Sequence, residues 1–357
     1  MKRRILSSVF LATVLMASGC GSIGPRTINH DRIDYSDAVG DSWKAQMLLN
    51  VVKLRYMDLP IFVDVAQIVS GYTLQTQVTV GGTVSSEKAI QGNFFNAAGA
   101  AQYTDRPTIT YSPLTGDKFL RALMTPIEPK AVFSMLESGY AADFVLGMTL
   151  ESLNGVNNRS VAAGALREAD PRFVKALQLL REIQTSGAFG VRVEQSPDKL
   201  QDVVFFFRGE GEVPPEIDAK TRQIRELLHL EANDRRYKLV YSPARGSKGE
   251  LGVGTRSVLQ IMQAMASFVD VPAEDIKERR AIPSLEHDAG NPGAIRIHSG
   301  PKRPTDAFAV ITYQGRWFWV DDRDWRTKRA LSVVMLLFTL ANTGGAESLP
   351  VITIPAS

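Results

Sequence analysis

Two serine–lysine pairs are the first residues of this sequence whose types and spacing could do chemistry. Ser85 and Lys88, like Ser196 and Lys199, have the Ser-x-x-Lys spacing at which a lysine one helical turn away could deprotonate a serine for nucleophilic attack. Enzymes that use such a pair also carry a Lys-Thr-Gly element, which is absent here. So short a pattern arises often by chance, and we expect both pairs to be coincidental.

Other catalytic signatures are also missing from the 357 residues. The sequence contains no HExxH, GxSxG or GxxxxGK[ST] motif, which are the usual marks of zinc peptidases, serine hydrolases and phosphate-binding loops. No two histidines are spaced i,i+4, so a zinc site is not predicted; they are His30, His229, His287 and His298. His287-Asp288 could form a carboxylate-oriented base, but no nucleophile can be assigned to it. We therefore predict no catalytic residue, no metal ligand and no cofactor.

Cys20 is the only cysteine of the chain, and the residues before it have a distinctive order. A short basic segment, Lys2 to Arg4, is followed by about 12 apolar residues and then by the small residues Ala17, Ser18 and Gly19. Such an apolar stretch is too short to cross a bilayer as a helix, which requires about 20 residues, and is typical of a secretory signal.

This order resembles the signal of bacterial lipoproteins, with Ala17 in the place where those proteins usually carry leucine. The resemblance implies that diacylglycerol is attached to Cys20 through a thioether and that residues 1–19 are removed. Gly21 follows the cysteine instead of the aspartate that retains many proteobacterial lipoproteins at the inner membrane. We therefore expect a lipid-anchored protein at the outer membrane that faces the periplasm, with an inner-membrane location as the less favoured alternative.

Removal of the signal changes the charge of the chain. The full sequence carries 41 Lys+Arg and 38 Asp+Glu, and three of the basic residues lie in the signal, so the mature chain is formally neutral. The sequence pI near 8.9 is then no argument for nucleic-acid binding. Since no polybasic patch follows Cys20, membrane attachment depends on the acyl chains.

The helix and strand patterns predict an α+β fold with mostly antiparallel sheets, capped amphipathic helices and one or two subdomains. We expect a tether over residues 20–35, an N-terminal α+β region over 36–155 and a C-terminal α+β region over 170–357, with 154–169 as the candidate boundary between the two regions. Helices are predicted from Ser36 or Asp37 to about 57, after Pro129, after Asp170, over 215–230, from Thr255 or Ser257 to about 269, and over 324–342. Strands are predicted within 61–80, 106–111, 191–194, 203–207, 237–241, 295–298, 308–313, 316–321 and 351–354, with Gln314-Gly315 as a hairpin turn. Residues 81–106 are predicted to form a long loop or an irregular hairpin.

The most distinctive local pattern lies at 316–326, RWFWVDDRDWR. On a strand, Trp317 and Trp319 point to one face and Phe318 and Val320 to the other. The two tryptophans, together with Arg316, Asp321 and Asp322, are our candidate binding surface for a glycan, peptide or partner protein. The alternative is a packed strand followed by acidic residues that cap a helix. Arg323, Arg326 and Arg329 recur every third residue, so they either share a helix face with these acids or bind an anion.

Three segments carry a wider resemblance: 36–62, 106–116 (RPTITYSPLTG) and 315–331 (GRWFWVDDRDWRTKRAL). They resemble uncharacterised predicted bacterial outer-membrane lipoproteins, a group that implies a location but no activity.

The sequence thus favours a non-enzymatic lipoprotein that is an interaction or assembly subunit of an envelope or export machine, with an envelope protein as partner. One alternative is a module that binds cell-wall glycan or peptide through the aromatic strand face. The other is a periplasmic hydrolase with an unrecognised site.

Overall fold

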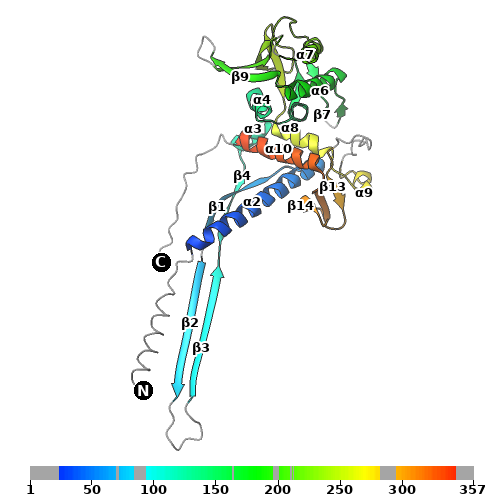
Figure 1. The fold of residues 1–357 in the computed structure, drawn as a ribbon. Coiled ribbons are helices and arrows are strands. Elements are labelled where there is room, and N and C mark those ends of the chain that lie inside the picture. Colours follow the sequence, from blue (N-terminus) through cyan, green and yellow to red (C-terminus); the bar gives the residue numbers. More distant parts are fainter. Residues whose placement is uncertain are drawn as a thin grey trace, which may run out of the picture. The chain divides into compact units, whose positions relative to one another are not determined.

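The computed structural model describes residues 24–69, 72–83, 94–162, 165–195, 201–209, 211, 213–281 and 295–342. Helices pack around sheets that are mostly antiparallel, which confirms the predicted α+β fold (Figure 1). The chain divides into two compact units. Of the described residues, the first unit comprises those within 24–42 and 63–113, and the second comprises those within 43–62 and 114–342. The predicted regions 36–155 and 170–357 do not coincide with these units.

The helix α2 (Gly24–Arg55) starts 12 residues before the predicted position at Ser36. Part of the predicted tether is therefore helical. The early turns were missed because they carry no apolar stripe, whereas the later turns bury Met47, Leu48, Val51 and Val52. Asn50 is fully buried, and its amide exchanges two hydrogen bonds of 2.8 Å with the backbone of Ile61.

The first unit is built mainly from strand pairs. The pair β1 (Phe62–Val69) and β4 (Thr108–Leu114) forms one two-stranded sheet. The pair β2 (Tyr72–Thr83) and β3 (Phe94–Asp105) forms another, with twelve antiparallel residue pairs. Of the two predictions for 81–106, a long loop or an irregular hairpin, the loop was wrong for β3, which pairs regularly with β2. Its sequence contains four alanines, Gly99 and Asn96, which have low strand propensity, and the strand is defined by its hydrogen bonds to β2.

The second unit contains a six-stranded sheet in the order β6-β5-β12-β11-β10-β9. Its strands are β5 (Leu150–Leu153), β6 (Val156–Asn157), β9 (Phe189–Gln195), β10 (Gln201–Phe207), β11 (Arg236–Tyr241) and β12 (Glu250–Thr255). The pairing of β11 with β12 is parallel, and the other pairings are antiparallel. The sheet joins strands from both sides of the candidate boundary at 154–169.

The glycines of β12 are required by close packing against the chain beside it. A Cβ on Gly252 would lie 2.3 Å from the carbonyl oxygen of Ala244, and a Cβ on Gly254 would lie 2.4 Å from Oγ of Ser152. Such distances are far below van der Waals contact, so larger residues do not fit without movement of the backbone.

Local capping signals correctly predicted several helices of the second unit. Asp170 caps α6 (Pro171–Thr185) by accepting a hydrogen bond of 2.8 Å from the backbone N–H of Arg172. Ser257 and Gln260 form a capping box at α8 (Val258–Ala266). The remaining helices of this unit are α3 (Asp117–Met124), α4 (Pro129–Glu137), α5 (Ala142–Thr149), α7 (Pro215–Leu227), α9 (Ala273–Lys277) and α10 (Trp325–Asn342).

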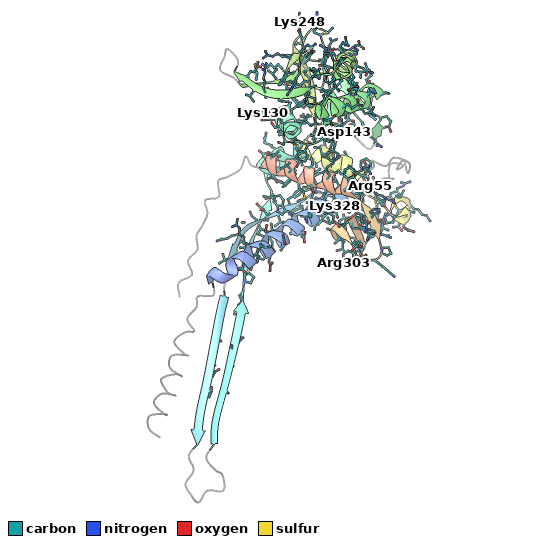
Figure 2. The ribbon with its side chains drawn as sticks, in the orientation of Figure 1. Arg55, Lys130, Asp143, Lys248, Arg303 and Lys328 are labelled. Carbon is teal, nitrogen blue, oxygen red and sulfur yellow. The ribbon has the colours of Figure 1, made fainter. Side chains whose placement is uncertain are left out.

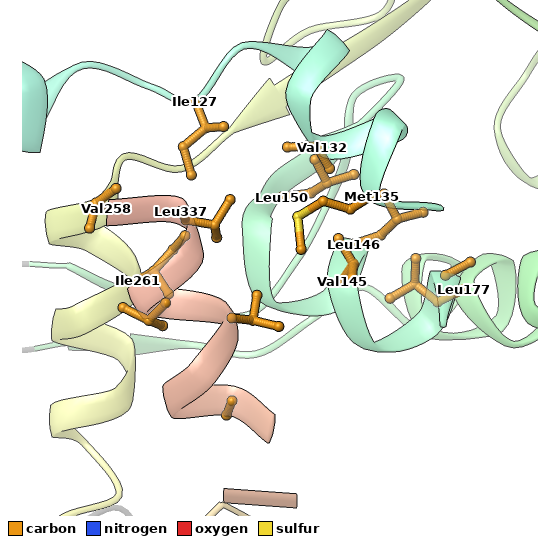
Figure 3. Packing of buried hydrophobic residues seen from close by; sticks show 14 of the residues in the cluster. Ile127, Val132, Met135, Val145, Leu146, Leu150, Leu177, Val258, Ile261 and Leu337 are labelled. Carbon is orange, nitrogen blue, oxygen red and sulfur yellow. The ribbon is translucent and has the colours of Figure 1, made fainter. Parts of the chain in front are cut away.

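The buried apolar core belongs to the second unit. Figure 3 shows how side chains of α4, α5, α8 and α10 meet, among them Val132, Leu146, Ile261 and Leu337, which are all almost fully buried. Among the described residues, no helix is long and apolar enough to cross a membrane.

A three-stranded antiparallel sheet precedes α10, in the order β13-β15-β14. Its strands are β13 (His298–Gly300), β14 (Ala307–Tyr313) and β15 (Arg316–Asp321). Gln314 and Gly315 form the predicted hairpin turn with φ angles of 47° and 76°, as a type I′ turn requires. A short pair, β7 (Ser160–Ala162) and β8 (Ala165–Arg167), completes the strands. The predicted strand 351–354 lies outside the described residues.

Candidate functional site

The aromatic strand β15 alternates as its sequence predicts. Phe318 and Val320 are fully buried, and Trp317 and Trp319 on the other face are half-buried. Phe318 packs edge-on against Tyr56, with 6.2 Å between ring centroids. The two tryptophans therefore lie on the partly solvent-exposed face of the strand.

Both indole rings are already in contact with polar groups of their own sheet. The imidazole of His298 stacks on Trp319, with 5.5 Å between centroids and 23° between planes. The guanidinium of Arg303, labelled in Figure 2, lies 5.6 Å from the ring centre of Trp317. Gly300 also lies against Trp319, because a Cβ there would approach that indole to 3.2 Å. A flat ligand would have to displace these groups before it could stack on either ring.

The acidic residues after β15 are engaged in local structure. Asp321 accepts a hydrogen bond of 2.8 Å from the backbone N–H of Arg323, and Asp322 pairs with Lys328 at 2.6 Å. Asp324 accepts from the N–H groups at the start of α10, at 3.1 Å each. This is the arrangement that the capping alternative describes. The fifth candidate, Arg316, faces Tyr313 in the hairpin register, next to the turn.

A cluster of tyrosines and acids lies on the buried side of β15, and sequence reasoning missed it. The hydroxyl of Tyr56 donates a hydrogen bond of 2.7 Å to Asp275, and that of Tyr313 donates one of 3.2 Å to Asp58. Burial raises the pKa of Tyr56, and the hydrogen bond to Asp275 adds to the effect. These bonds connect the end of α2, α9 and the three-stranded sheet, which is a structural role. No sequence signal pairs Tyr56 with a residue 219 positions away.

The three arginines at 323, 326 and 329 are separated by the structure. Arg323 pairs with Asp306 at 3.2 Å on the surface. Arg326 and Arg329 instead line a cavity of about 530 Å³ beside Trp325. Arg323 therefore pairs with an acid outside the 321–324 group, and anion binding by this series stays a prediction.

The prediction that the chain has no catalytic residue is largely untested by the structure. Both Ser-x-x-Lys pairs lie outside the described residues, and so do His287-Asp288 and Cys20. Within the part of the chain that the structure describes, no three His, Cys, Asp or Glu side chains are grouped so that they could hold a metal ion.

The pair β2–β3, which we call the ribbon, is the other candidate site. Its strands pair from Tyr72 with Asp105 to Thr83 with Phe94, and at about 3.4 Å per residue each strand is about 40 Å long. No third strand pairs with either member within the described residues, as the two isolated arrows in Figure 1 illustrate. Both outer edges thus carry backbone N–H and C=O groups that are available for pairing.

Comparisons with known proteins assign neither a family nor a function to the chain. The chain matches no protein-family model, and no curated protein or solved structure is significantly similar to it. The resemblance of its signal to that of bacterial lipoproteins therefore stays a prediction.

Proposed function

We propose that this protein is a lipid-anchored, non-enzymatic assembly subunit of an envelope or export machine, held at the outer membrane through Cys20 and facing the periplasm. In this proposal the ribbon is the element that joins it to neighbouring chains, by strand addition. The ribbon's two open edges are the observation that carries the proposal.

The ribbon lacks the features that normally prevent edge pairing. Natural proteins protect exposed edges with charged side chains, prolines, bulges or very short strands. Residues 72–83 and 94–104 contain no charged residue and no proline, and the register runs through twelve pairs without a shift. The exposed side chains include Gln75, Gln77 and Thr79. A strand from another chain could pair along such an edge without burying a charge.

An isolated two-stranded ribbon is also marginally stable in water, because it buries little apolar surface. Addition of further strands would pair its free backbone groups and make it part of a wider sheet. This is the recognition mode known as β-augmentation, in which the main chain supplies affinity and alternate side chains supply selectivity. The ribbon is therefore better suited to assembly than to catalysis.

The glycan-binding alternative is less favoured by the geometry. Trp317 and Trp319 are half-buried, and His298 and Arg303 lie against their rings. The hydrolase alternative stays untested, because both Ser-x-x-Lys pairs and His287-Asp288 lie outside the described residues.

Site-specific photocrosslinking in intact cells tests the proposal. A photoreactive amino acid at Gln77 of the full chain should give a discrete crosslinked product in the membrane fraction. Gln75→Lys together with Thr79→Lys should abolish that product at unchanged protein level, because lysines on an edge strand oppose strand addition. The same photoreactive residue at exposed Lys248, in the second unit, is the matched control and should give no such product.

A Cys20→Ala version of the probe strain tests the anchor. The chain should leave the membrane fraction or accumulate with its signal uncleaved, and palmitate labelling should disappear. Labelling that persists in this variant contradicts the anchor. Crosslinking at Gln77 that survives both lysines, or that is no stronger than at Lys248, contradicts the ribbon as the assembly element.

A further inference from the structure

A cavity of about 530 Å³ lies in the second unit, and neither Trp317 nor Trp319 lines it. This volume is within the range of small-molecule binding sites. Its walls come from α5, the segment between β6 and β7, the start and end of α8, and the first turns of α10. Most of its apolar lining is contributed by Phe144, Met148, Ile261, Met265, Phe268 and Ile295.

The charged lining of the cavity is strongly unbalanced. Four arginines line it, and Asp143 at its edge, labelled in Figure 2, is the one acidic lining residue among those described. Arg256 is engaged by the protein itself, because its guanidinium donates to the carbonyl oxygens of Met148 and Arg159 and pairs with Glu151 at 3.3 Å. Arg256 therefore stabilises the wall of the cavity, and the other three arginines are the candidates for binding a ligand.

Those three arginines, Arg159, Arg326 and Arg329, lie against aromatic rings. The guanidinium carbon of Arg329 is 3.7 Å from the ring centre of Phe144, and that of Arg326 is 4.7 Å from the ring centre of Trp325. Arg159 lies 5.8 Å from the ring centre of Phe268. A guanidinium that stacks on a ring keeps its N–H groups in its own plane, where they remain able to bind an anion.

No ion pair is formed by Arg159, Arg326 or Arg329 within the described part of the chain. In addition, the Nε atoms of Arg159 and Arg329 are buried and have no hydrogen-bond acceptor there. Buried donors of this kind are rare in folded proteins and call for an explanation. The pKa of Arg329 is lowered, chiefly by burial, while Asp143 opposes the shift and Arg181 and Arg326 add to it. A bound anion would satisfy the donors and compensate the burial of positive charge.

We propose that this cavity binds an anionic amphiphile, a molecule with a carboxylate or phosphate group on an apolar body. Arg159, Arg326 and Arg329 bind the anionic group, for which planar guanidinium groups are well suited. Phe144, Phe268 and the neighbouring aliphatic and methionine side chains bind the apolar body. The lining of the cavity shares no residue with the ribbon, so this proposal stands or fails independently of the proposed assembly role.

Titration calorimetry of the purified full chain in a non-ionic detergent tests this site with octanoate and octyl phosphate as probes, each below its micelle concentration. At least one should bind saturably, and the two probes distinguish a carboxylate from a phosphate source. Octanol, acetate and inorganic phosphate should bind at least tenfold more weakly, because each lacks the apolar body or the anionic group. Octanol that binds as tightly as octanoate and octyl phosphate would overturn the role of the arginines.

Arg329→Gln and, separately, Arg326→Gln should each weaken the preferred probe about tenfold or more while the melting temperature stays close to that of the unmodified chain. Arg323→Gln is the matched control, because this residue precedes the same helix but pairs with Asp306 on the surface, and it should bind the probe normally. Unchanged affinity in both Arg329→Gln and Arg326→Gln would overturn the proposal, as would the absence of saturable binding by either octyl anion.

Discussion

The ribbon and the six-stranded sheet are both largely antiparallel, and they differ in what covers them. In the six-stranded sheet, residues such as Phe205, Tyr237 and Val253 are almost fully buried beneath helices and loops. In the ribbon, the described side chains at 75, 77, 79, 81 and 98–102 are exposed. The ribbon has a regular register of twelve pairs, yet pairing alone supplies little net stability, because strands exchange hydrogen bonds with water for hydrogen bonds with each other.

This difference suggests that the two β-structures serve different ends. The six-stranded sheet is stabilised by burial of apolar surface, the dominant favourable contribution to folding. The ribbon offers unpaired backbone groups and exposed, uncharged side chains, which favour association. Substitutions should therefore affect stability in the six-stranded sheet and association in the ribbon.

The largest effect is expected at Phe205 of β10. This ring contacts Phe133, Phe189 and Phe207, with centroid distances of 4.9–5.7 Å. Phe205→Ala should cost about 3–5 kcal/mol of unfolding free energy, as large-to-small core substitutions do. Urea unfolding of the purified chain measures the loss.

Gln77→Ala in the ribbon is the matched comparison and should change the unfolding free energy by less than about 0.5 kcal/mol, because the side chain is exposed. Equal losses at Phe205 and Gln77 would show that the ribbon contributes to stability as the six-stranded sheet does, and the contrast between them would not hold.

A smaller effect is expected from the pH dependence of Tyr237 in β11. Burial raises its pKa to about 12, against an ordinary value of 10.0, and Arg225 opposes the shift. The folded state thus holds this proton more tightly than the unfolded state does, so its contribution to stability is complete below pH 10 and is lost as the pH rises towards 12. The loss amounts to about 2–3 kcal/mol, at about 1.4 kcal/mol per pKa unit.

Tyr237→Phe removes this ionisation, together with hydrogen bonds to the backbone of Glu231 and Asp234. At pH 8 the variant should be less stable than the original chain, and the gap should narrow between pH 10 and 12. A gap of constant size across this range would show that the Tyr237 hydroxyl does not titrate as a buried group.

The smallest loss is expected at Trp317, on the half-buried face of the three-stranded sheet. Trp317→Ala should cost about 1–2 kcal/mol, because the indole is only partly buried, whereas Phe318→Ala on the opposite face should cost about 3–5 kcal/mol. Thermal melts of both variants decide the matter. Equal losses of stability in the two variants would place Trp317 in the core and contradict the glycan-binding alternative. If Trp317→Ala folds normally but no longer retains glycan, the glycan-binding alternative is supported.

The parts of the fold that the sequence predicted are those with local causes. Asp170 and Ser257 are caps whose hydrogen bonds are made within three residues, and the turn at Gln314-Gly315 has its own backbone preference. The strand β12 was missed because Gly252 and Gly254 lower strand propensity. Their presence is explained only by the closeness of Ala244 and Ser152 in the folded chain.

The candidate sites also divide into features with local causes and features that depend on long-range packing. The alternation of β15 follows from the strand period, so the positions of Trp317 and Phe318 were predictable. The arginine-lined cavity was not, because Arg159 and Arg329 come from segments 170 residues apart in sequence, and only the packing of α5, α8 and α10 brings them to one cavity. The spacing of Arg326 and Arg329 was the one available signal.

The pairing of β5 with β12 has a consequence for when the sheet can form during synthesis. Asn154, just after β5, accepts a hydrogen bond from the backbone of Gly252 at 3.2 Å, across 98 positions of sequence. β5 also pairs with β12 through Ser152 and Gly254. A chain that emerges from its amino terminus, whether from a ribosome or through a translocation pore, cannot close this sheet until about residue 255 has appeared. Such long-range closure slows folding, so the core around this sheet forms late in the synthesis of the chain.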